Sequence, residues 1–261
     1  MGTNKIMVSI IIPTFNRNEL LELGLQSLDL QFISGKYEIL VLNEYLEGDG
    51  SKEICLRHRN VKYILTRKNG TKENIKWRCP GMAINIGVKL SQFPNIIITS
   101  PEIYHFDRNN IRNIVEPLLS NSKLMVYTEG IDDRGGKILK ALKFDGETYP
   151  QILNNKGKLT KLHTQYPFFM GINKEEFVNI GGYDERFQDG YCFDDTDYVS
   201  RMLLNGCNYL QVSGLIVHLY HSRLRLGLPK TKELWNRNEK LYAESYGSIV
   251  RNKGKEWGKL G

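Results

Sequence analysis

Acidic and imidazole side chains gather in two short pieces of the second half of this sequence. Asp194, Asp195 and Asp197 stand within four positions of one another, and His218 and His221 follow further along the chain. Neighbouring carboxylates repel, so such a cluster needs a cation, a shared proton or a helix N-terminus to hold it. Each of these is also a means of catalysis. We therefore interpret residues 187–197, together with the two histidines, as the chemical centre of the protein.

The composition is that of a globular α/β protein without membrane-spanning segments. The chain has 261 residues, of which 41% are hydrophobic, enough for a sizeable buried core. The strongest N-terminal apolar run, residues 10–12, is closed by Pro13 and is far too short to cross a bilayer. The four cysteines form no CxxC pair, which favours reduced thiols over a disulfide framework or a zinc site. We expect a cytoplasmic protein that could bind peripherally at a membrane surface.

The positive charge is concentrated at the C-terminal end. The formal net charge is +7, and residues 222–261 hold ten lysines and arginines against four glutamates. Such a basic tail favours an anionic partner, which could be a membrane surface, a lipid-linked diphosphate, nucleic acid or the phosphates of a substrate. A solvated tail that only keeps the protein soluble explains the same charge. No pattern indicates the oligomeric state.

Apolar runs rich in β-branched residues alternate with amphipathic segments, the pattern of a largely parallel sheet wrapped by helices. The predicted strands cover residues 7–12, 37–42, 61–66, 95–99, 123–128, 167–172, 209–212 and 215–220. The predicted helices cover residues 19–30, with Asn18 as N-cap, and residues 51–59, 81–90, 110–120, 174–180, 196–204 and 232–246. The polar, glycine-containing span 130–157 is expected to be a loop or an irregular hairpin.

The predicted strand ends indicate where a ligand would bind. In an open parallel sheet, ligands bind in the crevice beyond the carboxyl ends of the strands. The segments that follow the first four predicted strands are residues 13–17, 43–44, 67–68 and 100–102. We expect these segments to line the site. No strand is followed by a G-x-G-x-x-G turn, which disfavours a dinucleotide-binding oxidoreductase.

Six motifs occur together in this chain: VSIIIPTFNR at 8–17, YEILVLN at 37–43, PGMAINIG at 80–87, FMGINKEEFVNIGGYDERF at 169–187, FDDTD at 193–197 and HLYH at 218–221. In their order and spacing they resemble family 2 glycosyltransferases of the GT-A fold. The resemblance implies an α/β fold with a mixed central sheet flanked by helices. It implies a catalytic domain over residues 1–222, with a nucleotide-binding half to about residue 102 and an acceptor half over 103–222. It does not cover residues 223–261, which we expect to form a basic, partly helical extension.

The resemblance implies an inverting transfer of a sugar from a nucleotide diphosphate, with UDP expected, to an acceptor hydroxyl. The second acidic residue of the family's paired motif is then the catalytic base, which is Asp195 here, and Asp194 or Asp197 orients acceptor hydroxyls. A carboxylate at a helix N-terminus stays ionised at neutral pH, because the positive end of the helix favours its charge. The alternative interpretation of the same residues is an ordinary helix cap with an acidic first turn.

The departing diphosphate needs a metal ion or cationic side chains. Most relatives place an Asp-x-Asp motif after the fourth strand, whereas residues 100–102 of this chain read Ser-Pro-Glu. By resemblance, a Mn²⁺ or Mg²⁺ ion would be held by Glu102, His218 and His221, with His105 as a weaker candidate. Without a metal, the charge would fall to cationic side chains such as Arg67, Lys68, Lys72, Arg78 or Arg223.

The resemblance also implies where the two substrates bind. The residues expected at the donor are Pro13, Thr14, Phe15, Arg17, Asn43, Glu44, Asn85, Ser100 and Glu102. Asn43 stands where relatives carry an acid that reads the base and ribose, and its amide can both donate and accept hydrogen bonds. Asn85 could equally be a residue of helix packing. Sugars stack their apolar faces on aromatic rings. The residues expected at the acceptor are Asp194, Asp197, Tyr183, Tyr191, Phe193 and Trp77.

These motifs leave the sugar and the acceptor open. Acceptors in glycan, polysaccharide or lipid-linked glycan assembly fit the family, and the basic tail adds a variant that glycosylates hydroxymethylated bases of nucleic acid. A non-catalytic nucleotide-sugar-binding protein is a different class, which the missing first aspartate makes conceivable. Donor turnover would distinguish it from an enzyme. Steep salt dependence of acceptor binding would indicate nucleic acid.

Overall fold

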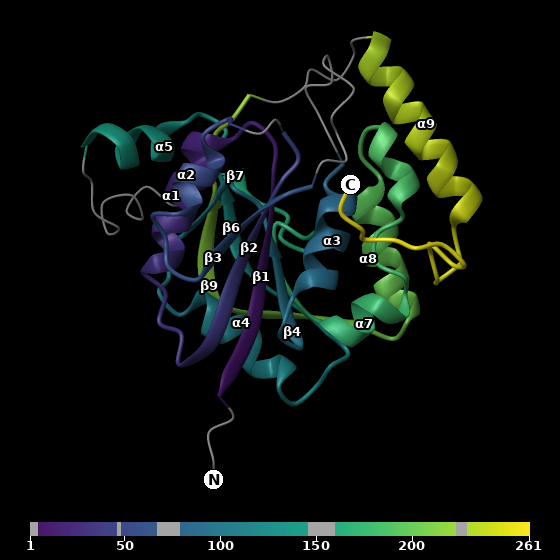
Figure 1. The fold of residues 1–261 in the computed structure, drawn as a ribbon, viewed down its shortest axis with the longest axis horizontal. Coiled ribbons are helices and arrows are strands. Elements are labelled where there is room, and N and C mark those ends of the chain that lie inside the picture. Colours follow the sequence, from purple (N-terminus) through teal and green to yellow (C-terminus); the bar gives the residue numbers. More distant parts are fainter. Residues whose placement is uncertain (1–4, 46–47, 67–78, 146–159, 223–228) are drawn as a thin grey trace.

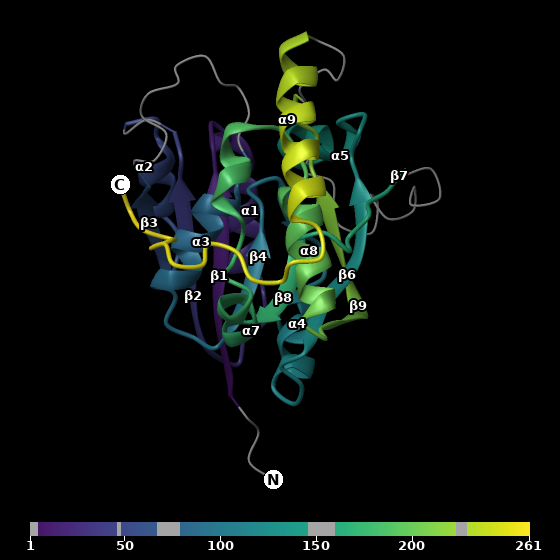
Figure 2. The same cartoon turned by 90° about the vertical axis from the view of Figure 1, so that its right-hand side faces the viewer.

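The computed structural model describes residues 5–45, 48–66, 79–145, 160–222 and 229–261. Within them, one mixed β-sheet runs through the centre and helices cover both of its faces (Figure 1, Figure 2). The strands are β1 (Ile6–Thr14), β2 (Gly35–Asn43), β3 (Val61–Leu65), β4 (Asn95–Thr99), β5 (Ile103–His105), β6 (Leu124–Asp132), β7 (Thr160–Lys161), β8 (Phe169–Asn173) and β9 (Asn208–His218). Their order across the sheet is β3-β2-β1-β4-β8-β6-β9-β5, and β7 pairs with β6.

The sheet is parallel in one half and mixed in the other. β1 pairs in parallel with β2 and β4, and β2 pairs in parallel with β3. β8 runs antiparallel to both β4 and β6, whereas β6 and β9 run parallel to each other. The carboxyl ends of β1, β2, β4, β6 and β9 therefore lie at one edge of the sheet, where a ligand crevice is expected. The predicted mixed central sheet is confirmed.

The helices divide between the two faces of this sheet. They are α1 (Asn18–Asp29), α2 (Ser51–Cys55), α3 (Gly81–Leu90), α4 (Asn110–Leu118), α5 (Lys137–Lys140), which continues into a π-helical turn η1 (Ala141–Asp145), α7 (Lys174–Asn179), a 3₁₀ turn η3 (Glu185–Asp189), α8 (Asp194–Leu204) and α9 (Pro229–Ser245). α1, α2 and α4 share a core with Ile10 of β1, whereas α3, α7 and α8 share another with Ile11. Successive strand residues point to opposite faces, so the apolar run of β1 supplies both cores.

Most predicted elements are present, and the helix 81–90 and the strand 95–99 have the predicted bounds. The loop expected from residue 130 is wrong in its first part, because Gly130–Asp132 continue β6 and α5 follows. The two strands expected over 209–220 are one strand, β9, which crosses a register shift near Gly214. β5 and β7 were not predicted. Asn18 is the first residue of α1 rather than its N-cap, and its side chain donates to the Asp49 carbonyl.

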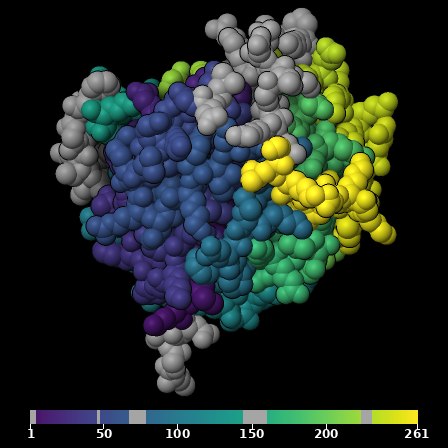
Figure 3. Space-filling view, viewed as in Figure 1, coloured from purple at the N-terminus to yellow at the C-terminus, as the bar shows by residue number. Residues whose placement is uncertain are grey.

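The chain after α9, residues 246–261, is called the C-terminal segment. It returns across the face of the sheet that α3, α7 and α8 cover. Figure 2 shows this segment crossing α8 and reaching α3, and in Figure 3 its atoms lie against those of both helices. The Arg251 amide donates to the Ile180 carbonyl at 3.0 Å, and the Gly261 amide to the Thr66 carbonyl at 3.0 Å. The Lys89 ammonium lies 4.1 Å from the centroid of the Trp257 ring. The C-terminal segment is therefore bound to the rest of the protein. The boundary expected at residue 222, between a catalytic domain and a C-terminal extension, stays a prediction.

Of the described helices, none combines the length and the apolar character that a membrane crossing requires.

Candidate active site

A pocket of about 460 Å³ opens at the carboxyl edge of the sheet. Its described lining includes the ends of β1, β4, β6 and β9, the first residues of α8, the start of α3, Leu162 and residues 166–168. It brings together the two groups that are far apart in the sequence, the carboxyls at 194–195 and the histidines at 218 and 221. Arg17 is the one arginine or lysine among the described lining residues. The acidic and imidazole groups of the lining are Glu44, Glu102, Asp132, Asp194, Asp195, His218 and His221.

A strained turn presents the acidic pair to this pocket. Cys192 and Phe193 have φ values of 60° and 70°, a left-handed conformation that non-glycine residues seldom adopt. This turn makes Asp194 and Asp195 the first two residues of α8. α9 holds the turn in place, because Asn238 Nδ2 donates to the Cys192 carbonyl at 2.9 Å. Strain of this kind persists where surrounding contacts enforce it, and it clusters at functional sites.

The two carboxyls at the start of α8 are not equivalent. Asp195 is half-buried, and its Oδ1 accepts a hydrogen bond from the Tyr183 hydroxyl at 3.0 Å. Burial raises the pKa of Asp195 to about 6, although the Tyr183 hydrogen bond acts in the opposite direction. Burial, and after it the charge of Asp195, raise the pKa of Asp194 well above its usual range. Both directions disfavour a doubly charged pair, because two carboxylate charges side by side in this buried position are costly.

Arg17 connects Glu102, which follows β4, to His221, which follows β9. Its Nε donates to Glu102 Oε1 at 3.0 Å, and its Nη2 lies 3.4 Å from His221 Nδ1. Burial lowers the pKa of His221, although the nearby Glu102 carboxylate acts in the opposite direction. The lowered pKa favours a neutral imidazole at neutral pH. His218 Nδ1 lies 3.2 Å from Asp132 Oδ1, at the ends of the paired strands β9 and β6.

The three expected metal ligands all line the pocket, but their arrangement does not fit a metal ion. Within the described part of the chain, no three His, Cys, Asp or Glu side chains are placed so as to hold a metal together. A metal between Glu102 and His221 would have to displace Arg17, which contacts both. The weaker candidate His105 is buried against Phe169, with ring centroids 4.7 Å apart, and its pKa is lowered to about 3 by burial. His105 is a packing residue.

Two expected donor residues lie outside the pocket lining. The Asn43 side chain closes the loop after β2: its Nδ2 donates to Ser51 and Tyr63, both at 3.0 Å, and its Oδ1 accepts from the Tyr45 amide at 2.8 Å. Asn85 is buried in α3, where its Oδ1 accepts from the Tyr183 amide at 2.8 Å and its Nδ2 donates to the Tyr183 carbonyl at 2.9 Å. These internal bonds use the groups with which either amide would have bound a nucleoside. The other expected donor residues all line the pocket.

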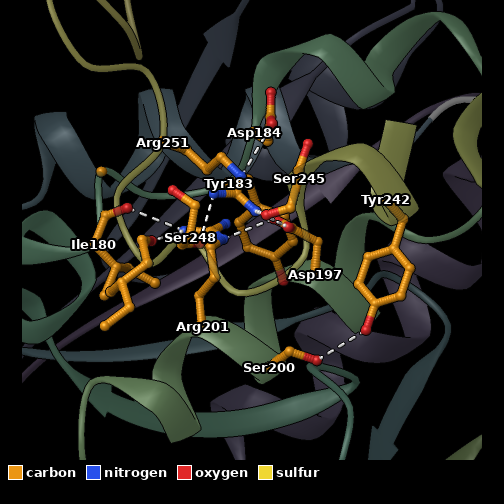
Figure 4. Close-up of polar contacts among 12 residues, drawn as sticks. Ile180, Tyr183, Asp184, Asp197, Ser200, Arg201, Tyr242, Ser245, Ser248 and Arg251 are labelled. Atoms are coloured by element: carbon orange, nitrogen blue, oxygen red, sulfur yellow. Dashed lines mark hydrogen bonds and ion pairs between the residues drawn. The ribbon is translucent and has the colours of Figure 1, made fainter. Parts of the chain in front are cut away.

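Asp197 contacts the C-terminal segment (Figure 4) and is not among the described residues that line the pocket. Its Oδ2 accepts from Arg201 Nε at 2.7 Å and its Oδ1 from Arg251 Nη2 at 2.7 Å, and all three side chains are buried. Arg251 also lies 3.3 Å from Asp184, a second buried carboxylate. Burial alone would raise the pKa of Asp184, but its bonds with Arg186 and the charge of Arg251 hold it below its usual range. Asp197 therefore does not line the described pocket, because both of its oxygens are paired internally, and its expected role at the acceptor stays a prediction.

Some of the aromatic residues expected at the acceptor line the pocket and others do not. Tyr191 and Phe193 line the pocket, and both contact Trp235 of α9, with ring centroids 6.1 and 4.9 Å apart. Tyr183 is fully buried, so it cannot stack on a sugar. Trp77 lies outside the described residues, as do the alternative cations Arg67, Lys68, Lys72, Arg78 and Arg223.

Sequence reasoning missed Asp132 and the segment 166–168, which also line the pocket. Asp132 is the last residue of β6, and the rule that ligands bind beyond strand ends would have found it if β6 had been extended past residue 128. The role of Asn238 and Trp235 could not be read from the sequence, because both act from α9, which the resemblance does not cover.

The fold has counterparts among solved structures. The mannosyltransferase PcManGT from Pyrobaculum calidifontis, in complex with GDP-Man and Mn²⁺, aligns with a TM-score of 0.53 at 16% identity; the alignment covers 85% of this chain and 59% of that one. S. aureus TarS 1-349 in complex with UDP-GlcNAc aligns with a TM-score of 0.57 at 15% identity and coverages of 94% and 68%. A mycobacterial protein gives 0.58 at 13% identity, with coverages of 95% and 76%. At these identities the likeness shows the fold, and this chain spans about three-fifths of the length of PcManGT.

A comparison with curated protein sequences gave no match. The sequence family described as glycosyl transferase family 2 does match, over residues 9–181. That range includes β1, β2, β4 and β8, which form the part of the sheet that carries Arg17, Ser100 and Glu102 at its edge. Since the match extends over more than half of the chain, the protein belongs to glycosyl transferase family 2.

Proposed function

We propose that the protein transfers a sugar from a nucleotide diphosphate donor to an acceptor hydroxyl, with inversion at the anomeric carbon. The observation that supports this most is the place of Asp195, a carboxyl that lines the pocket on the first turn of α8 and accepts a hydrogen bond from Tyr183. Its pKa of about 6 suits a general base at neutral pH, since it is deprotonated there and still basic enough to accept a proton.

In this mechanism the acceptor oxygen attacks the anomeric carbon while the bond from that carbon to the diphosphate oxygen breaks. The electron pair of that bond leaves with the nucleoside diphosphate, and Asp195 takes the acceptor proton. Asp194 stays protonated beside it because a second charge in this buried pair is costly. A protonated Asp194 can donate a hydrogen bond, and its Oδ2 has no partner among the described residues. We assign to Asp194 the orientation of a substrate hydroxyl.

Arg17 is the described residue suited to the departing diphosphate. Its guanidinium is always charged, and the Nη2 contacts with His221 and the Ser222 carbonyl are long, 3.4 and 3.5 Å, so these N–H groups can turn to phosphate oxygens. Thr14 Oγ1 and Ser100 Oγ are buried in the pocket lining without partners among the described residues. A bound donor would satisfy them. Since the expected ligands do not fit a metal ion as they are arranged, no step is assigned to one.

The nucleotide is expected to be UDP and the sugar a hexose. Structures of the same fold have been solved with GDP-Man and with UDP-GlcNAc, so donors with both bases deserve testing. The acceptor is expected to belong to glycan, polysaccharide or lipid-linked glycan assembly, with Tyr191 and Phe193 as its aromatic contacts. A cytoplasmic location, with peripheral membrane contact, remains part of this proposal.

A panel of UDP-, GDP- and other nucleotide sugars tests the proposal. Selective thermal stabilisation by one donor identifies the base, because a ligand that binds the folded state raises its stability. Release of the nucleoside diphosphate, with or without an added sugar acceptor, then measures turnover. We expect one donor to give both. Stabilisation by a donor without hydrolysis or transfer to any acceptor would instead indicate a non-catalytic nucleotide-sugar-binding protein.

A further inference from the structure

Two buried tyrosines lie beside the proposed base, and only one of them bonds to it. Tyr183 and Tyr198 stack with ring centroids 4.4 Å apart and an angle of 5° between the rings. Both are fully buried. The Tyr183 hydroxyl donates to Asp195 Oδ1 at 3.0 Å, whereas the Tyr198 hydroxyl has no hydrogen-bond partner among the described residues. A buried hydroxyl contributes to stability only when it has a hydrogen-bond partner. Of the two hydroxyls, that of Tyr183 is therefore the one that can hold Asp195.

Tyr183 is fixed from two directions. α3 holds its backbone through Asn85, which bonds both its amide and its carbonyl. The C-terminal segment holds the same carbonyl, because Asn252 Nδ2 donates to it at 2.7 Å and to the Gly181 carbonyl at 2.8 Å. Gly181 has a φ of 76°, and a Cβ there would lie 2.1 Å from the Arg251 carbonyl oxygen. The Gly181-Gly182 pair therefore allows the C-terminal segment to lie directly on the backbone that carries Tyr183.

We propose that Tyr183 is the positioning residue of Asp195, that its hydroxyl keeps this carboxylate oriented and ionised, and that Asn252 of the C-terminal segment holds Tyr183 for that purpose. The inference rests on the proposed function, in which Asp195 is the base. It assigns a catalytic purpose to a segment that lies beyond the family match, which ends at residue 181.

The surroundings of Asp195 make this hydrogen bond important. Of the groups around it, Asp194 adds a like charge if it ionises, and the Cys79 and Cys192 thiols and the Tyr198 phenol are neutral groups whose pKa values burial raises. None of these groups supplies a positive charge. Among the described side chains, Tyr183 alone donates a hydrogen bond to Asp195. A hydrogen bond to the charged form favours that form, so removal of the hydroxyl moves the equilibrium toward a protonated, inactive base.

The stacked pair provides a matched experiment: Tyr183→Phe and Tyr198→Phe each remove one hydroxyl from the same stack. The measurement is the pH profile of kcat and of kcat/KM for transfer. We expect Tyr183→Phe to move the acidic limb upward by about one pH unit, the shift that corresponds to one hydrogen bond to a charged group. Its kcat should fall about tenfold below pH 6 and recover at high pH, with the donor KM unchanged. Tyr198→Phe should keep the wild-type limb.

Asn252→Ala should move the limb in the same direction by a smaller amount, since Asn85 still holds Tyr183. Direct titration of the Asp195 carboxyl by NMR in the folded protein follows the same shift without an activity assay, so the test survives a variant with low turnover. Equal profiles and equal Asp195 titrations for the two phenylalanine variants would overturn the inference. Full turnover by Asp195→Asn would instead overturn the proposed function on which it rests.

Discussion

Asp194 and Asp195 are adjacent in the sequence, but their surroundings differ. Asp194 is buried without a partner for its Oδ2 among the described residues, whereas Asp195 is half-buried and accepts the Tyr183 hydrogen bond. Two interacting carboxyls that differ in this way divide one proton unequally. The chemistry of the proposed active site is therefore determined by burial and by one hydroxyl, neither of which the acidic motif itself reveals.

A first prediction concerns the pH dependence of activity. Burial raises the pKa of Asp195 to about 6, and the base acts only when it is ionised. The value of kcat/KM should therefore be constant above about pH 7 and should fall about tenfold for each pH unit below 6. This limb belongs to the coupled pair rather than to one residue. A pH profile of kcat/KM for the acceptor, measured with saturating donor, checks it, and an acidic limb near pH 4 would contradict it.

A second prediction concerns Arg17 and the metal. Because Arg17 is the described cation in the pocket and the expected ligands do not fit a metal, donor binding should persist in a chelator. Arg17→Met should weaken binding of the nucleoside diphosphate about tenfold to a hundredfold, the loss expected for one charge-assisted hydrogen bond. Arg57→Met, which removes an exposed arginine of another surface, is the control. Calorimetry with and without Mn²⁺ measures both. Binding that is lost in the chelator and restored by Mn²⁺ would contradict this account.

At the scale of elements, α8 and the C-terminal segment are held together by buried charges. Arg251 bridges Asp197 of α8 and Asp184, and Figure 4 shows the backbone carbonyls that complete its surroundings. A buried ion pair adds little net stability over an apolar core, but the loss of one partner leaves a charge buried without compensation. The position of α8 therefore depends on the position of the C-terminal segment.

A third prediction follows for Arg251. Arg251→Met should lower the free energy of unfolding by about 3–5 kcal/mol, since it leaves Asp184 and Asp197 without one of their cations. Lys253→Met is the matched control, because it removes an exposed cation two residues away and should change stability by less than about 0.5 kcal/mol. Urea denaturation of both variants checks this. Similar stabilities would show that Arg251 contributes no more than a surface charge.

The sequence predicted best those elements whose pattern is local. α3 and β4 had the correct bounds, since an apolar run or stripe fills each of them from end to end. β6 was ended too early at Thr128 because Gly130 and Asp132 are unusual in a strand, although Leu162 and Thr164 pack where a side chain at 130 would stand. β5 and β7 are too short to show a pattern.

The candidate site was predictable to the extent that it lies beyond strand ends. Pro13, Thr14, Arg17, Glu102 and the acidic pair line the pocket as expected. Asn43, Asn85 and Asp197 do not, because the bonds that occupy them come from residues that only the fold brings near. A short-range motif cannot show whether a polar side chain faces the ligand or its own backbone.

At the scale of the whole molecule, the basic character of the C-terminal region is partly internal. Arg251 is buried between two carboxylates, and exposed cations of the region pair with acids, as Lys240 does with Glu244 and Lys259 with Glu256. The positive charge that suggested a polyanionic partner thus includes residues that hold the protein together. This lowers the number of cations that could contact a nucleic acid or an anionic membrane.

A fourth prediction is therefore a shallow salt dependence. Once an acceptor is found, the plot of log affinity against log salt should have a slope no steeper than about −2. A nucleic acid held by six phosphate contacts would give a slope of about −5. Titrations between low and moderate salt distinguish the two. A slope of the steeper kind would favour the variant that acts on hydroxymethylated bases.

The most direct test of the central claim compares donor binding and transfer in Asp195→Asn. An amide at position 195 keeps the size and the surroundings of the carboxylate but cannot take the acceptor proton. We predict that the affinity for the nucleotide sugar stays within about threefold of wild type while kcat for transfer falls by about 10²–10⁴, the range that general base catalysis contributes. Transfer at the wild-type rate by a folded Asp195→Asn protein would contradict the account.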